Sequence, residues 1–145
     1  MFEESGIPGN PAQGEQPRVL AVGHSEEMRA MLRWVYARLG WAYQTADTCG
    51  EALRVLRRDP VPVVITEENL PDGDWKLLLS ALASQSPRPE LIVYCDRLDD
   101  ELWAEVLTLG GYDVLLGPLE AEEVILVTCL ASQSPRGAQR TVASL

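Results

Sequence analysis

The sequence predicts a single α/β domain built on a doubly wound parallel sheet. Short β-branched runs alternate with longer stretches whose apolar residues recur three and four positions apart, the pattern of βα units. The 145 residues suffice for one domain of ordinary size, and a hydrophobic content of 46% can fill its core. Five βα units of about 23 residues each account for the chain after its first 17 residues.

Five short apolar runs are the predicted strands. Three of them are almost entirely apolar, as expected for strands that helices cover on both faces of a sheet. The predicted strands are Val19–Val22, Ala42–Thr45, Val61–Thr66, Leu91–Cys95 and Val114–Leu116.

A helix is predicted after each strand. The first, Glu26–Leu39, carries its apolar side chains on one stripe and is followed by Gly40, a residue suited to a left-handed C-terminal cap. The second opens at Thr48, which forms a capping-box pattern with Glu51. The other three helices are predicted at Asp74–Gln85, Asp99–Leu109 and Glu120–Gln133.

Composition sets the expected domain limits. Residues 1–17 are rich in Gly, Pro, Gln and Glu, so we expect a flexible N-terminal tail, a domain over residues 18–133 and a C-terminal tail over residues 134–145. The three cysteines are widely spaced and contain no CxxC pair, and no secretory leader is recognisable. Together these features predict a cytoplasmic protein with reduced thiols.

Charge and hydropathy exclude two classes of partner. The chain has 12 basic and 22 acidic residues, a net charge of −10, which repels phosphate backbones and anionic headgroups. No apolar stretch approaches the roughly 20 residues that a membrane span needs. We therefore expect neither a nucleic-acid nor a membrane partner.

Two segments resemble the receiver domain of bacterial response regulators. Val61–Trp75 (VPVVITEENLPDGDW) is similar to the strand, turn and helix around that family's phosphoacceptor, with Pro71 and Gly73 in the turn. Gly110–Glu120 (GGYDVLLGPLE) is similar to the family's fifth strand and its Lys-Pro ending, with Pro118 after the lysine position. The resemblance covers all five βα units and implies a three-layer, flavodoxin-like, five-stranded parallel sheet with strand order 2-1-3-4-5.

The resemblance also implies a phosphoryl-accepting site, and this sequence departs from it at each functional position. The family's acidic pair, which helps to hold Mg²⁺ through oxygen ligands, corresponds to Gly23 and His24. The acceptor aspartate corresponds to Glu67. The hydroxyl and the lysine that hold the phosphoryl oxygens correspond to Cys95 and Gly117. We therefore expect a pseudo-receiver with no Mg²⁺ cofactor, no catalytic residue and no enzymatic activity.

Two other hypotheses remain open. A phosphorylatable receiver could use Glu67 or Asp72 as an unorthodox acceptor. Alternatively, His24, Glu67 and Cys95 follow neighbouring strands and are expected to share one pocket, where they could bind Zn²⁺ or form a thiol site.

The expected function is signal transduction by protein contact, as an atypical response regulator in a two-component, phosphorelay-type pathway. Residues Val124–Leu130 (VILVTCL) of the fifth helix are apolar around most of the helix, so part of it needs cover. Three alternatives account for this apolar surface: the helix is packed deeply in the core, the C-terminal tail covers it, or a partner protein covers it. In the family the fourth helix, fifth strand and fifth helix form the usual contact face, for a signalling protein or a second copy. The candidate contributors here are Trp103, Leu107, Val124 and Val127.

Overall fold

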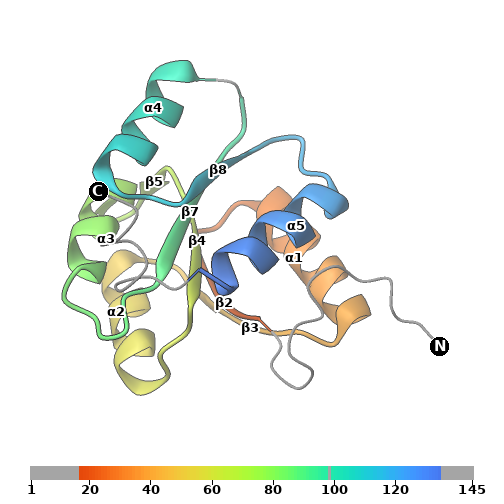
Figure 1. The fold of residues 1–145 in the computed structure, drawn as a ribbon, viewed down its shortest axis with the longest axis horizontal. Coiled ribbons are helices and arrows are strands. Elements are labelled where there is room, and N and C mark those ends of the chain that lie inside the picture. Colours follow the sequence, from red (N-terminus) through yellow and green to blue (C-terminus); the bar gives the residue numbers. More distant parts are fainter. Residues whose placement is uncertain (1–16, 98, 135–145) are drawn as a thin grey trace.

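Five parallel strands form one sheet, and its order confirms the predicted 2-1-3-4-5 arrangement (Figure 1). The computed structural model describes residues 17–97 and 99–134, so nearly all of both predicted tails lies outside the described residues. From one edge to the other, the strands are β3 (Ala42–Ala46), β2 (Arg18–Val22), β4 (Val63–Glu67), β7 (Glu90–Cys95) and β8 (Asp113–Leu116).

Helices cover both faces of the sheet and complete three layers (Figure 1). Successive residues of β2 belong to two different core clusters, because side chains alternate between the faces of a strand. The cluster on one face includes α1 (Glu26–Leu39) and α5 (Ala121–Ser132). The cluster on the other includes α2 (Cys49–Arg58), α3 (Trp75–Leu82) and α4 (Asp100–Leu109).

The observed caps of α1 and α2 agree with those predicted from the sequence, with one difference. Gly40 ends α1 at a φ of 73°, the left-handed conformation predicted for it. The Thr48 hydroxyl accepts a hydrogen bond from the Glu51 backbone N–H at 3.0 Å, which is the first half of the capping box. The Glu51 carboxylate, however, accepts from the Asp47 backbone N–H at 2.8 Å, one residue before the expected donor.

A small hairpin precedes α3 and was not predicted. It pairs β5 (Asn69–Leu70) with β6 (Gly73–Asp74), so that Pro71 and Asp72 form its tip. Asp74 then caps α3 by accepting hydrogen bonds from two backbone N–H groups, so the helix starts one residue later than predicted and ends earlier, at Leu82. The hairpin confirms a turn around Pro71 and Gly73, and it projects Asp72 toward α2.

The packing of α5 corrects the predicted partner surface. Val124 is 0% exposed and Val127 is 8% exposed, because both lie in the core cluster between the sheet and α1. Thr128, the polar residue of this stretch, is also buried, and its hydroxyl lies 3.4 Å from the Tyr36 hydroxyl of α1. The prediction that Val124 and Val127 contribute to a contact surface is therefore wrong: deep packing accounts for these two residues.

Candidate functional site

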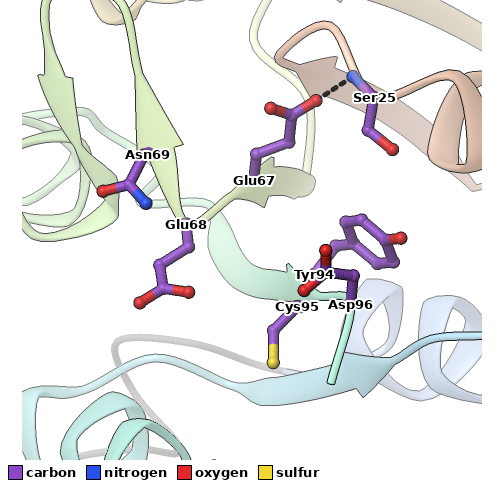
Figure 2. A pocket seen from close by; sticks show the side chains of 7 residues that line it. All are labelled: Ser25, Glu67, Glu68, Asn69, Tyr94, Cys95 and Asp96. Atoms are coloured by element: carbon purple, nitrogen blue, oxygen red, sulfur yellow. Dashed lines mark hydrogen bonds between the residues drawn. The ribbon is translucent and has the colours of Figure 1, made fainter. Parts of the chain in front are cut away.

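The candidate site is a pocket of about 220 Å³ at the carboxyl edge of the sheet, where the resemblance places phosphoryl chemistry. Figure 2 shows its lining side chains, which come from the ends of β4 and β7, from the start of β5 (Asn69–Leu70) and from the loop between β2 and α1. The lining residues are Ser25, Glu67, Glu68, Asn69, Tyr94, Cys95 and Asp96.

Glu67, at the acceptor position, is turned onto the loop that follows β2. Its carboxylate accepts a hydrogen bond from the Ser25 backbone N–H, and Figure 2 shows the side chain directed toward Ser25 and away from Cys95. At the end of β2, Gly23 has a φ of +128°, a conformation that favours glycine. A Cβ atom at Gly23 would lie 2.6 Å from both Cγ and Oε2 of Glu67. The longer acid at 67 and the missing side chain at 23 are therefore geometrically matched.

The backbone of Gly23 is fixed from two sides. Its N–H donates to the carbonyl of Ala46 at 2.8 Å, and its carbonyl accepts from Arg29 Nε at 2.9 Å. Arg29 is itself paired with Asp47, with 2.8 Å between Nη2 and Oδ1. This network holds the loop in the position that brings the Ser25 N–H to Glu67.

His24 does not reach the pocket, which corrects the predicted grouping with Glu67 and Cys95. Its side chain is 61% exposed, and Nε2 lies 4.0 Å from Asp47 Oδ1. The positive φ of Gly23 turns the chain at the end of β2, and the imidazole lies beside Asp47 rather than among the pocket residues. Within the described ranges, no group of three His, Cys, Asp or Glu side chains is arranged to hold a metal ion.

Cys95, at the position of the family's hydroxyl, is buried and engaged. Its thiol donates to the Arg97 backbone carbonyl with a sulfur-to-oxygen distance of 2.7 Å. Burial raises the pKa of the Cys95 thiol, and the nearby carboxylates of Glu68 and Asp96 raise it further. Because a free thiol already titrates above neutral pH, Cys95 is protonated at pH 7 and is a poor nucleophile or metal ligand.

Gly117, at the lysine position, lies next to the carboxylate of Glu27, a residue that the sequence analysis did not single out. A Cβ atom there would be 3.0 Å from Glu27 Oε1 and 3.3 Å from Asp96 Cα. Glu27 accepts hydrogen bonds from the Tyr94 hydroxyl and, at 2.7 Å, from the Leu119 backbone N–H. Burial and the bond to Glu27 raise the pKa of Tyr94 to about 12. Glu27 thus joins α1 to β7 and to the loop before α5.

The pocket residues carry negative charge without a matching cation. Glu67, Glu68 and Asp96 line it, and its lining includes no basic side chain. The chain's lysine, Lys76, lies on α3 and is paired instead with Glu105 of α4, with 3.0 Å between Nζ and Oε2. A phosphoryl group in this pocket would face carboxylates rather than a positive charge.

Asp72, the second candidate acceptor, lies outside the pocket lining. Its two carboxylate oxygens accept from the backbone N–H groups of Cys49 and Gly50 at 2.9 and 3.0 Å. These two hydrogen bonds hold the pKa of Asp72 below its usual range. Asp72 therefore acts as a cap that ties the hairpin tip to the start of α2.

Sequence comparison finds response regulators. No protein-family model matches the chain. The chain is 31% identical over 117 residues to the probable transcriptional regulatory protein TcrX of Mycobacterium tuberculosis. The aligned region covers 79% of this chain and 49% of TcrX. It is 25% identical over 116 residues to the regulatory protein AtoC of Escherichia coli, covering 80% and 25% of the two chains. The chain thus spans about half of one relative and a quarter of the other.

Structural comparison finds receiver domains. The signal receiver domain of an HD domain-containing protein from Pseudomonas fluorescens is 26% identical, with a TM-score of 0.70, and the match covers 81% of this chain and 94% of that one. The NtrC4 receiver domain, determined as a beryllofluoride-activated dimer, is 25% identical, with a TM-score of 0.72 and coverage of 80% and 96%. A putative response regulator from Chloroflexus aurantiacus shares the fold, with a TM-score of 0.76, 18% identity and coverage of 83% and 100%.

Proposed function

Because this chain belongs to the receiver domains of response regulators, we propose that it transmits a two-component signal by protein contact, with neither a phosphoryl group on Glu67 nor a bound Mg²⁺ ion. On this proposal it is a cytoplasmic pseudo-receiver and is not an enzyme. The observation that carries the proposal is the hydrogen bond from the Ser25 backbone N–H to the Glu67 carboxylate. The Glu67 side chain occupies the space that a Cβ atom at Gly23 would fill.

An acceptor carboxylate must be free and aligned for in-line attack on the phosphoryl donor. In this chain the Glu67 carboxylate is turned away and bonded to backbone, so phosphorylation would first have to break that bond. The donor set for Mg²⁺ does not fit either, since Gly23 supplies no side chain and His24 lies beside Asp47. An imidazole is in any case a better ligand for transition metals than for Mg²⁺.

The other two family positions are also taken up by internal contacts. The Cys95 thiol donates to a backbone carbonyl, and the Glu27 carboxylate lies over Gly117, where a lysine would have to extend. Glu27 also bonds the Leu119 backbone N–H, which fixes the loop between β8 and α5. We propose that these contacts hold the domain in one signalling conformation.

Exposed apolar side chains on α4 and α5 supply the proposed contact surface. Trp103 and Leu107 of α4 are about half exposed, as a contact role requires. On α5 the exposed residues are Leu126 and Leu130, which replace Val124 and Val127 as candidates. A signalling partner or a second copy, as in a homodimer through the face of α4, β8 and α5, would cover this surface. The NtrC4 receiver neighbour is described as a dimer.

Intact-mass measurement tests the proposal. The full chain is incubated with a small-molecule phosphodonor and Mg²⁺, beside a receiver that carries the acidic pair, the aspartate and the lysine. We expect the control to gain one phosphoryl group and this chain to keep its mass. A gain that maps to Glu67 would overturn the proposal. A gain that maps to Asp72 would support the unorthodox acceptor instead.

A further inference from the structure

Charge is divided between two parts of the fold. Residues 17–59, which form β2, α1, β3 and α2, contain seven basic and five acidic residues. Residues 60–134, which form the rest of the sheet and α3 to α5, contain three basic and 14 acidic residues. The first part therefore carries a net charge of +2 and the second a net charge of −11, so a contact between the first part of one copy and the second part of another joins opposite net charges.

The outer face of α1 combines basic and apolar side chains. Trp34 is 54% exposed, and the guanidinium carbon of Arg38 lies 4.8 Å from the centroid of its ring. Arg33 is exposed and forms no ion pair within the described part of the chain. A largely apolar pocket of about 480 Å³ lies beside Trp34, and its other lining residues are Glu27, Ala30, Met31 and Ala121. We call this the α1 face, with Ala30, Arg33, Trp34, Ala37 and Arg38 as its exposed residues.

The outer face of α4 has the opposite charge. Trp103 is 50% exposed and Leu107 is 40% exposed, and the two are one helical turn apart. The first turn carries Asp100 and Glu101, both exposed. We call these four residues, together with the exposed Ala104, the α4 face. The α1 face offers the small side chains of Ala30 and Ala37, between which large side chains such as Trp103 and Leu107 can pack.

The two faces lie on opposite sides of the sheet, because α1 packs in one core cluster and α4 in the other. Figure 1 shows the two helices well separated, with α4 beside α3 and α1 beside α5. One copy can therefore use both faces at the same time.

We infer that the chain assembles head to tail, with the α4 face of one copy packed on the α1 face of the next. The inference rests on the proposed function, since it names a second copy as an occupant of the α4 contact surface. An antiparallel crossing places Asp100 and Glu101 beside Arg33 and Arg38. The same crossing keeps the exposed Glu26, at the start of α1, beside the last turn of α4, which carries no acidic residue. A contact between two different faces continues from copy to copy as a ring or an open chain.

The contact is expected to be weak and sensitive to salt. One helix packed on another buries less than the roughly 1,200–2,000 Å² of a standard stable interface, so association needs a high protein concentration. The opposed charges are exposed, and 0.5 M NaCl screens them over a few ångströms.

Sedimentation velocity of the full chain over a wide concentration range tests the inference. We expect the wild type to form species larger than dimers at low salt and to return toward monomer in 0.5 M NaCl. R33E/R38E and D100R/E101R should each remain monomeric alone. An equimolar mixture of the two should associate again, because each reversed face then meets a reversed partner. R57E/R58E makes the same charge change on exposed residues of α2 and should associate as the wild type does.

Controls separate misfolding from loss of contact. D100R/E101R changes the first turn of α4, so W103K, a change at an exposed position without a capping role, is measured beside it, and all variants are checked by circular dichroism. A wild type that stays monomeric at every concentration overturns the inference. Association of R33E/R38E at wild-type strength also overturns the inference. If D100R/E101R is monomeric in the same experiment, the contact is a symmetric one between the α4 faces of two copies. Neither result affects the phosphorylation test, so the inference and the proposed function can fail independently.

Discussion

The fit between Gly23 and Glu67 predicts a specific non-additivity in a double-mutant cycle. Replacing Gly23 with alanine strains a residue at φ +128° and drives its Cβ into the Glu67 side chain. The strain costs about 1–3 kcal/mol. Expulsion of the carboxylate also breaks its bond to the Ser25 N–H, and a hydrogen bond to a charged group contributes about 1.5–3 kcal/mol.

Glu67→Ala alone loses the same hydrogen bond but introduces no clash. In Gly23→Ala/Glu67→Ala the hydrogen bond is lost only once, so the double variant should be more stable than the sum of the single changes predicts. The expected difference equals the energy of that bond, about 1.5–3 kcal/mol. Urea unfolding of the four proteins, followed by circular dichroism, measures it.

Gly40→Ala is the matched control for this cycle. Gly40 also has a positive φ, of 73°, but a Cβ atom there meets no atom within 4 Å. Its destabilisation should therefore add to that of Glu67→Ala within about 0.5 kcal/mol. If Gly23→Ala and Glu67→Ala are equally additive, the carboxylate does not occupy the space above Gly23, and the argument for a closed acceptor site fails.

Three further predictions concern titrating groups. The pKa of Asp72 is lowered in the folded protein, so its contribution to stability is present above the unfolded value near 4 and is lost as the pH falls through the folded pKa. Asp72→Asn should thus lower the melting temperature at pH 7 and lower it by less at pH 3, and equal losses at both would contradict the capping role. The pKa of Tyr94 is raised to about 12, so its contribution is present below the unfolded value near 10 and is lost above 12. Tyr94→Phe should remove a phenolate absorbance step near pH 12 and cost about 1.5–3 kcal/mol at pH 7, since the lost hydrogen bond is to a carboxylate; an unchanged titration would contradict the bond to Glu27. Because burial raises the thiol pKa of Cys49, Cys95 and Cys129, thiol labelling at pH 7 should be slow in the native protein and fast in denaturant, whereas rapid native labelling of Cys95 would reopen the thiol hypothesis.

Local patterns predicted most of the fold. The start and end of α1, and the caps at Gly40 and Thr48, depend on residues within a few positions of each other and were found as expected, except that Glu51 accepts from the Asp47 N–H and not from that of Thr48. The hairpin at Pro71 and Asp72 was missed, although Pro-Asp-Gly is a turn sequence, because strands of two residues leave no periodic pattern.

The errors in the site have a different origin, since they depend on contacts between distant segments. The apolar circumference of α5 could be read as a partner surface or as deep packing, and only the position of α1 shows that Val124 and Val127 are core. Glu26 and Glu27 are adjacent glutamates that the sequence does not distinguish, yet Glu27 accepts a hydrogen bond from Tyr94, 67 positions along the chain. The direction of the His24 side chain depends on one backbone angle, at Gly23, that composition does not encode.

The amide resonance of Ser25 gives the most direct test of the central claim. Its N–H reports the Glu67 carboxylate, so Glu67→Ala should move the resonance strongly. Beryllofluoride with Mg²⁺, a phosphoryl mimic that activates the NtrC4 receiver, should leave it where it is at every concentration. A saturable shift of the Ser25 amide resonance together with those of Cys95 and Asp96 would mean that the pocket accepts a metal and a phosphoryl group. The domain would then be a receiver regulated by phosphorylation, which contradicts the central claim.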